Sequence, residues 1–245
     1  FKTNLEGLGD LDRLKPRSSD SSDPTLFAAS ADETAVAGSY DIEVLTLAQS
    51  AKVRSDSFTD ADTEIIGTGT LDISLGADTF QITVDSSNNT LEGIRDAINN
   101  ASDNSGIAAS IINVDGGSQL VLGSDTNGLA NVITVAAVDG DGADGFDLAR
   151  LDSANLTIAQ AAQDATFKLD GQLVTKDSNS FSDVITGVTI DLKKEAVDTI
   201  ETLTVDLNKG AVEEKMKRFA STYNALTDVL KQLSSYNPET KVAGP

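Results

Sequence analysis

The stretch best suited to chemistry is residues 139–145, which read Asp-Gly-Asp-Gly-Ala-Asp-Gly and gather carboxylates between glycines. A calcium loop needs oxygen ligands at alternating positions, a glycine at the sixth position and a bidentate glutamate at the twelfth. Counted from Asp139, the fifth position is Ala143, the sixth is Asp144 and the twelfth is Arg150. Because this register fails, we favour an acidic surface turn, and a low-affinity cation site is the alternative.

Other catalytic chemistry is limited by what the composition lacks. His, Cys and Trp are absent, which removes imidazole bases, thiol nucleophiles and disulfides. With 39 Asp and Glu residues, any one pair of carboxylates is uninformative. Gly67-Thr-Gly-Thr lacks the Gly-Lys-Ser/Thr of a phosphate-binding loop, and no Gly-x-Ser-x-Gly occurs. We therefore predict that the protein is not an enzyme and needs no cofactor or metal.

The charge balance limits the partners. The 245 residues include 39 acidic and 18 basic side chains, a formal net charge of −21. A phosphate-binding surface needs clustered Lys and Arg, so nucleic acid and an anionic membrane surface are disfavoured. No run approaches the roughly 18 apolar residues of a membrane span, and no signal peptide is visible. Because Phe1 is not a natural start, we interpret the chain as a fragment that lacks both terminal regions.

Apolar residues at every second position predict strands over most of the chain. A helix-like segment at 1–14 and a polar linker at 18–23 precede them. The central stretch 67–151 is predicted to be a β-β-α-β-β unit, with one short helix behind the cap candidates Asn89 and Thr90, and Ile133 and Val135 suggest one further strand. The positions that carry these periods are Tyr40, Ile42 and Val44, then Leu71, Ile73 and Leu75, then Phe80, Ile82 and Val84, the helix face Leu91, Ile94, Ala97 and Ile98, and finally 107–114, 120–122, Ile133 and Val135.

A second β region follows the central unit. Asp170-Gly171 is a preferred pair for a two-residue type I′ hairpin, which predicts that Phe167 lies opposite Val174. Two more strands are predicted by the alternating residues Val188, Ile190 and Leu192, and by Leu203, Val205 and Leu207.

A heptad seam marks the last helix, which is predicted to begin after the cap Asn208 and to end at Asn237-Pro238. Glu213 precedes Lys217, and Glu214 precedes Arg218, each by four residues, the favourable order for helix-surface ion pairs. The seam residues alternate in spacing between four and three, as in a coiled coil, and they are Val212, Met216, Phe219, Tyr223, Leu226, Leu230 and Leu233. Segment 1–14 is too short and glycine-rich to cover this stripe, so we expect further partners in neighbouring subunits or in parts of the protein beyond this chain.

The fold class expected from this order of elements is α+β and mostly β. We predict a helical leg domain (D1) at 1–25 and 208–245 and an inner β head domain (D2) at 26–66 and 152–207. The unit at 67–151 is predicted to be an outer head domain (D3), inserted in a loop of the inner one.

Several motifs resemble one protein family in the same order along the chain. They are Gly38-Ser-Tyr-Asp-Ile-Glu-Val44, Leu47-Ala-Gln-Ser50, Ala161-Ala-Gln-Asp-Ala-Thr-Phe167, Ser178-Asn179, Val184-Ile-Thr-Gly-Val-Thr-Ile190 and Phe219-Ala-Ser-Thr-Tyr-Asn-Ala-Leu226. Residues 89–99 and 106–110 resemble the hook IN motif that flagellar proteins share. Together they are similar to the flagellar filament cap family FliD, also called hook-associated protein 2.

The resemblance implies a structural role. Members form a ring at the tip of the growing flagellum, outside the cell after passage through the flagellar export apparatus, and promote the folding and insertion of flagellin. The implied partners are further copies of the chain, flagellin and hook–filament junction proteins, and some members are linked to adhesion to host mucin. Another axial protein, such as a flagellin or hook-junction relative, and a surface adhesin head are the alternatives.

Overall fold

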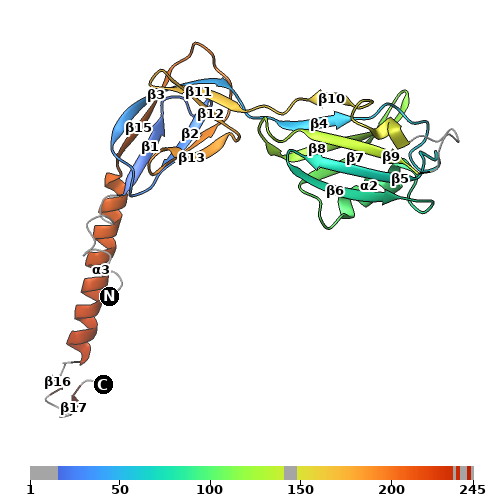
Figure 1. Ribbon diagram of the computed structural model, residues 1–245. Helices are drawn as coiled ribbons and strands as arrows, with labels where there is room; N and C mark the ends of the chain where they lie inside the picture. The colour runs from blue at the N-terminus through green and yellow to red at the C-terminus, as the bar shows by residue number, and fades with distance from the viewer. Residues whose placement is uncertain (1–15, 141–147, 234–235, 238–241, 244–245) are drawn as a thin grey trace. The chain divides into compact units, whose positions relative to one another are not determined.

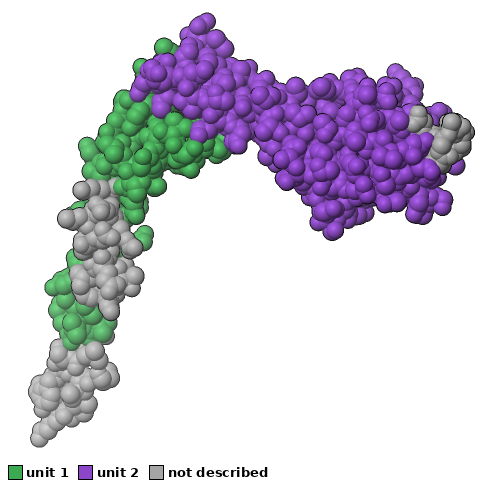
Figure 2. Space-filling view, in the orientation of Figure 1, with its two compact units in different colours: residues 1–42, 180–193, 200–245 green, residues 43–179, 194–199 purple. Residues whose placement is uncertain are grey.

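The computed structural model describes residues 16–140, 148–233, 236–237 and 242–243, and it divides into two units (Figures 1 and 2). Unit 1 comprises residues 1–42, 180–193 and 200–245, and unit 2 comprises 43–179 and 194–199. The fold is α+β and mostly β, as the alternating sequence predicts. The predicted helical segment at 1–14 and residues 141–147 of the acidic loop lie outside the described residues.

Unit 1 contains two small antiparallel sheets and a long helix. In one sheet, β15 (Glu201–Leu207) lies between β1 (Arg17–Ser21) and the first half of β3 (Gly38–Thr46). In the other, β14 (Val188–Leu192) lies between β13 (Ser180–Ile185) and β2 (Phe27–Ala31). The alternation predicted at 188–192 is confirmed, and the buried residues of the unit include Phe27, Ile42, Val188, Ile190, Leu192, Leu203 and Val205.

Strand β1 corrects the predicted polar linker at 18–23. It pairs with β15 in continuous antiparallel register, from Arg17 opposite Leu207 to Ser21 opposite Leu203. The Ser19 hydroxyl also donates to the Ala29 carbonyl at 2.7 Å. Backbone hydrogen bonds rather than a buried apolar face hold this strand, so hydrophobic periodicity carries no signal of it.

Unit 2 packs two sheets around one apolar core. In the three-stranded sheet, β5 (Gly69–Leu75) lies between β6 (Asp78–Val84) and β9 (Ile133–Asp139). The four-stranded sheet has the order β10 (Thr157–Gln160), β4 (Ser50–Arg54), β8 (Gly117–Asn127) and β7 (Ile107–Val114). Helix α2 (Leu91–Asn100) packs against β7 and β6, and the 3-10 helix η1 (Leu148–Leu151) packs against β9. The largest fully buried residues of this core are Phe58, Phe80, Ile66, Leu71, Ile73, Leu91, Ile94, Ile98 and Leu148.

Strands β4 and β10 join the sheet of β7 and β8 although they lie outside 67–151. Val53 of β4 pairs with Leu122 of β8 and, on its other side, with Ile158 of β10. The apolar core of unit 2 correspondingly extends from Ala51 to Ala162. The β-β-α-β-β unit expected from the sequence therefore gains one strand from each flank.

The hairpin predicted at Asp170-Gly171 is confirmed. Strand β11 (Ala165–Leu169) pairs with β12 (Gln172–Lys176), with Phe167 opposite Val174. Asp170 has φ of 49° and Gly171 has φ of 77°, the pair of positive values that a type I′ turn requires.

Glu43 is a buried carboxylate of β3, between the buried apolar residues Ile42 and Val44. Its carboxylate accepts the Lys168 ammonium at 2.8 Å and the Asp198 N–H at 2.9 Å. Asp198 has φ of 60°, a left-handed conformation that costs energy for a residue other than glycine. Glu43 thus fixes the loop at 194–199 against β3 within unit 2.

A pH-dependent loss of stability is expected from Glu43. The pKa of its carboxyl is lowered from 4.5 by the hydrogen bond from Lys168 and then by that from Asp198. A carboxyl whose pKa is lower in the folded state stabilises above its unfolded pKa, and this contribution disappears as the pH falls through the folded pKa. We expect the urea midpoint of the wild type to exceed that of Glu43→Gln above about pH 5 and to approach it below pH 4.5. A difference independent of pH would contradict this assignment.

Helix α3 (Lys209–Leu233) begins as predicted but ends earlier. The Asn208 side-chain oxygen accepts the Ala211 N–H at 2.9 Å, which is the predicted N-cap. Asn237 belongs to β16 (Tyr236–Asn237), paired with β17 (Val242–Ala243), so the prediction of helix up to Asn237 is wrong. A residue before proline disfavours the α conformation, which explains an extended Asn237 before Pro238. Within the described part of the chain, no helix is long and apolar enough to cross a membrane.

Candidate functional site

The predicted seam forms an apolar stripe along α3 in unit 1. Met216, Tyr223 and Leu230 are exposed by 61%, 50% and 53%, whereas Val212, Phe219 and Leu226 are half-buried. The side chain of Leu233 lies outside the described residues. Between residues 209 and 231 no side chain of the helix is buried, so its apolar stripe is open enough to contact another helix.

Local contacts order the surface of this helix. Glu213 and Lys217 form the predicted ion pair at 2.7 Å. The rings of Phe219 and Tyr223 stack with their centroids 6.4 Å apart, as neighbours at i and i+4 on one face can. The seam residues are therefore held on one side of α3, and their role as a contact surface stays a prediction.

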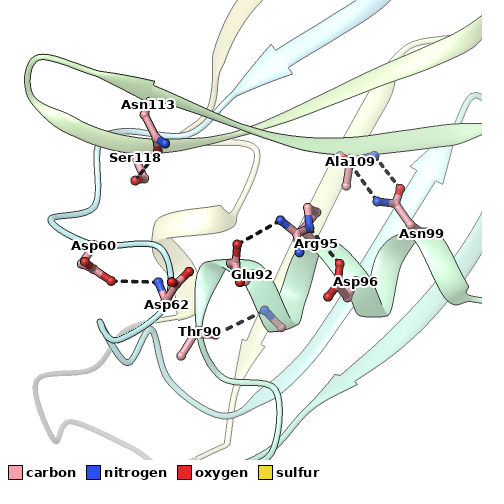
Figure 3. Close-up of polar contacts among 11 residues, drawn as sticks. Asp60, Asp62, Thr90, Glu92, Arg95, Asp96, Asn99, Ala109, Asn113 and Ser118 are labelled. Atoms are coloured by element: carbon pink, nitrogen blue, oxygen red, sulfur yellow. Dashed lines mark hydrogen bonds and ion pairs between the residues drawn. The ribbon is translucent and has the colours of Figure 1, made fainter.

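Unit 2 contains an open polar cleft of about 570 Å³ that the sequence did not predict (Figure 3). One wall is the N-terminal half of α2, with Glu92 and Arg95, and a second wall is the loop at 59–62. The third wall is the tip of the β7–β8 hairpin, which contributes residues Ile111, Asn113, Val114, Gly117 and Ser118.

The α2 wall is fixed by its cap and by ion pairs. The Thr90 hydroxyl oxygen accepts the Gly93 N–H at 3.2 Å, which confirms one of the two cap candidates. Arg95 reaches Glu92 at 3.2 Å and Asp96 at 2.8 Å (Figure 3). The hydrogen bond from the Arg95 guanidinium lowers the pKa of the neighbouring Asp96 carboxyl.

The loop wall is shaped by Asp60. Its carboxylate accepts the N–H groups of Asp62 and Thr63, each at 2.9 Å. These hydrogen bonds, first that from Asp62 and then those from Thr63, lower the pKa of the Asp60 carboxyl. Asp60 is thus used to form the turn, whereas the exposed Asp62 side chain lies at the mouth of the cleft (Figure 3).

Phe58 anchors that loop to the hairpin. Its N–H donates to the Ser118 carbonyl at 2.8 Å, and the Ser118 N–H donates back at 2.7 Å. The Arg150 guanidinium lies 3.8 Å from the centroid of the Phe58 ring and pairs with Glu64 at 2.9 Å. Phe58 therefore joins two walls of the cleft, the loop at 59–62 and the β7–β8 hairpin. Its ring is in turn contacted by Arg150, which lies 92 residues further along the chain.

The sequence predicts neither the cleft nor the contacts of Asn99 and Asn104 with strand β7. Asn99 is the last residue of the segment 89–99 that resembles the hook IN motif, but nothing in its spacing shows that its amide pairs with the backbone of Ala109. The only available signal was the polar residue at the end of a short amphipathic helix, and that pattern is common. Across the described residues there is no group of three or more Asp or Glu placed to hold a metal. The alternative of a cation site in the acidic loop stays a prediction, because residues 141–147 are not described.

Three family models match the chain in order. "Flagellar hook-associated protein 2 N-terminus" matches residues 1–51, "Flagellin hook IN motif" matches 70–126, and "Flagellar hook-associated protein 2 C-terminus" matches 162–244. The hook IN segment contains α2 and the β7–β8 hairpin, hence two walls of the cleft. The C-terminal segment contains α3 and its seam.

Curated proteins and solved structures agree with these matches. The B-type flagellar hook-associated protein 2 of Pseudomonas aeruginosa is 38% identical over 95% of this chain and 52% of its own length. The Escherichia coli K12 flagellar hook-associated protein 2 is 34% identical over 96% and 51%. The chain thus spans about half the length of these relatives.

The crystal structure of FliD (HAP2) from P. aeruginosa PAO1 has a TM-score of 0.76 at 36% identity, covering 87% of this chain and 98% of that one. The D1-D2-D3 structure of the E. coli flagellar cap protein FliD has a TM-score of 0.81 at 29% identity, covering 96% and 67%.

The order of the matched segments defines a structural protein of the bacterial flagellum rather than an enzyme. The chain belongs to the flagellar hook-associated protein 2 family, the flagellar cap proteins called FliD. The family resemblance predicted from the sequence motifs is therefore confirmed.

Proposed function

We propose that this chain is the leg-and-head part of a subunit that caps the flagellar filament tip outside the cell and promotes flagellin folding and insertion. Family membership supports the capping role. Within this chain, the observation that supports a role in assembly is the apolar stripe of α3, where Met216 and Leu230 are more than half exposed. Such a stripe is suited to a helical leg that packs against other helices rather than to catalysis.

The proposed organisation has three parts. Residues 1–25 and 208–245 are assigned to the leg (D1), 26–66 and 152–207 to the inner head (D2), and 67–151 to the outer head (D3). Within the first range, β1 pairs with β15 and so adds a strand to the inner head. The continuous apolar core of unit 2 supports a separate outer head, to which β4 and β10 add their strands. In this arrangement the hook IN segment lies in the outer head, and the seam lies in the leg.

The partners follow from this assembly. A heterologous contact between neighbouring subunits, repeated until the ring closes, would give a ring of identical subunits. We assign the seam to the contacts within the leg and between subunits. Flagellin and hook–filament junction proteins are the further proposed partners, reached after passage through the flagellar export apparatus. No nucleic acid or membrane contact is proposed, because the net charge of −21 opposes both.

The decisive experiment is end-labelling of growing filaments. Gold-labelled protein is added to polymerising flagellin, and electron microscopy records where the label lies. We expect label at one end of each filament. Label along the whole filament would instead support the alternative of another axial protein that copolymerises.

The adhesion hypothesis has a separate test. A glycan array that includes mucin-type glycans, probed with the purified protein, would show whether a surface adhesin role exists beside capping. Binding there together with end-labelling would add adhesion to the proposal, and binding without end-labelling would replace it.

A further inference from the structure

Strand β7 forms one edge of the four-stranded sheet in unit 2. Among the described strands it pairs with β8 only, in unbroken antiparallel register from Ile107 opposite Ser124 to Val114 opposite Gly117. In such a ladder, the N–H and C=O groups of successive residues point alternately toward and away from the partner strand. Asn99 and Asn104 bond Ala109 and Ile107 from the side away from β8, so the odd-numbered residues of β7 direct their backbone groups outward.

The first half of this outward edge is closed by two asparagine side chains. Asn99 donates to the Ala109 carbonyl and accepts the Ala109 N–H, both at 2.8 Å (Figure 3). Asn104 donates to the Ile107 carbonyl at 2.7 Å and accepts the Ile107 N–H at 2.8 Å. Each amide imitates the peptide group of a neighbouring strand, and so satisfies a sheet edge that would otherwise attract another chain.

The second half of the edge opens into the cleft. The alternation that directs Ala109 outward also directs the backbone groups of Ile111 and Asn113 outward, and both residues line the 570 Å³ cleft. In the described part of the chain no hydrogen bond reaches these outward groups. Ile112 and Val114 of the same strand are exposed by 49% and 43%, which leaves apolar side chains beside an open edge.

The opposite walls of the cleft are acidic. Glu92 and Arg95 precede Asn99 on α2 by seven and four residues, which places the three side chains on one face of the helix. Because Asn99 binds β7 at Ala109, Glu92 and Arg95 lie beside the part of β7 that follows Ala109. Asp62 and Asp60 follow on the loop wall (Figure 3). Three carboxylates against one guanidinium favour a basic ligand in this cleft over an acidic segment, such as most of the surface of this chain of net charge −21.

We infer that this cleft binds an extended basic peptide segment of a partner protein, which adds as a strand to β7 at Ile111 and Asn113. The peptide backbone completes the ladder that Asn99 and Asn104 begin. Its alternate side chains lie toward Glu92 and Asp62, where Lys or Arg fits, and the others contact Ile112 and Val114. This inference stands independently of the capping function, because it rests only on the edge, the volume and the charges of unit 2.

The probe is a fluorescein-labelled seven-residue peptide of alternating lysine and valine, and its binding to the whole chain is measured by fluorescence anisotropy. The informative variant is Asn113→Pro, which removes the outward N–H but leaves the β8 ladder intact, as edge positions tolerate. Asn113→Ala is the matched control, since it loses the same side chain and keeps the N–H. We expect Asn113→Pro to bind at least about fivefold more weakly than Asn113→Ala.

Charge is tested by Asp62→Asn and by a peptide of alternating glutamate and valine. Asp62→Asn should weaken binding of the lysine peptide by about threefold and reduce its dependence on salt. The glutamate peptide should bind at least about tenfold more weakly than the lysine peptide. Equal binding by the two Asn113 variants, equal binding of the two peptides, or no binding of the lysine peptide to the wild type would each overturn the inference.

Discussion

Replacing Phe58 with alanine should lower the free energy of unfolding of unit 2 by about 3–5 kcal/mol. The ring is 1% exposed and lies in the apolar core beside residues of both sheets. Removing it leaves a cavity that β-structure on both sides cannot fill without disturbing paired strands. It also removes the face on which the Arg150 guanidinium rests at 3.8 Å, a contact that adds about 0.5–2 kcal/mol when partly desolvated.

The measurement is urea unfolding followed by circular dichroism, with the transition of unit 2 analysed separately if the two units unfold independently. Phe58→Leu is the matched control, because it keeps most of the apolar volume and should cost about 1.5 kcal/mol. The two variants differ only in how much of the site they fill. If Phe58→Ala unfolded at the same urea concentration as the wild type, the ring would not anchor the loop at 59–62 as we describe.

The parts of the fold that the sequence predicts are those held by local rules. A two-residue turn needs two positive φ values, and Asp170-Gly171 supplies them directly in the sequence. A helix start needs an oxygen for its free N–H groups, and Thr90 and Asn208 supply it. The buried faces of β5 and β6 follow from period-two apolar residues, because one side of each strand faces the core.

The parts that the sequence does not predict depend on partners far along the chain. Strand β1 has no apolar face, and the backbone ladder that holds it is offered by β15, about 185 residues later. Nothing in the sequence around Glu43 shows that Lys168 and the backbone N–H of Asp198 will bind its carboxylate. The cleft combines a loop, a helix and a hairpin, and its open edge follows from which residues of β7 the two asparagines reach.

The seam on α3 likewise combines a feature that the sequence predicts with one that only the structure shows. The heptad spacing of the seam is a local property, so the sequence shows which residues share one face of α3. The exposure of Met216 and Leu230 is a tertiary property, and it appears only in the structure. Exposure changes what a substitution should do, because an exposed apolar residue contributes little to the stability of its own chain.

Leu230→Asp should therefore leave the stability of the isolated chain nearly unchanged and weaken its self-association. Leu230 is 53% exposed, so a charge there stays hydrated, and we expect the free energy of unfolding to fall by less than about 1 kcal/mol. In a helix–helix contact between subunits the same charge would be buried without a partner. Loss of a central apolar contact of this kind costs about 2 kcal/mol or more, which corresponds to at least about thirtyfold weaker association.

Multi-angle light scattering over a range of concentrations measures the association, and urea unfolding measures the stability. Ser221→Asp is the matched control: it introduces the same charge on the same helix, two residues from Phe219 and Tyr223 and hence on the opposite face. The seam is the contact surface if Leu230→Asp dissociates the assembly while Ser221→Asp retains it. Equal association of the two variants would move the contact to another surface, and a large loss of stability in Leu230→Asp would show that the seam packs within a single chain.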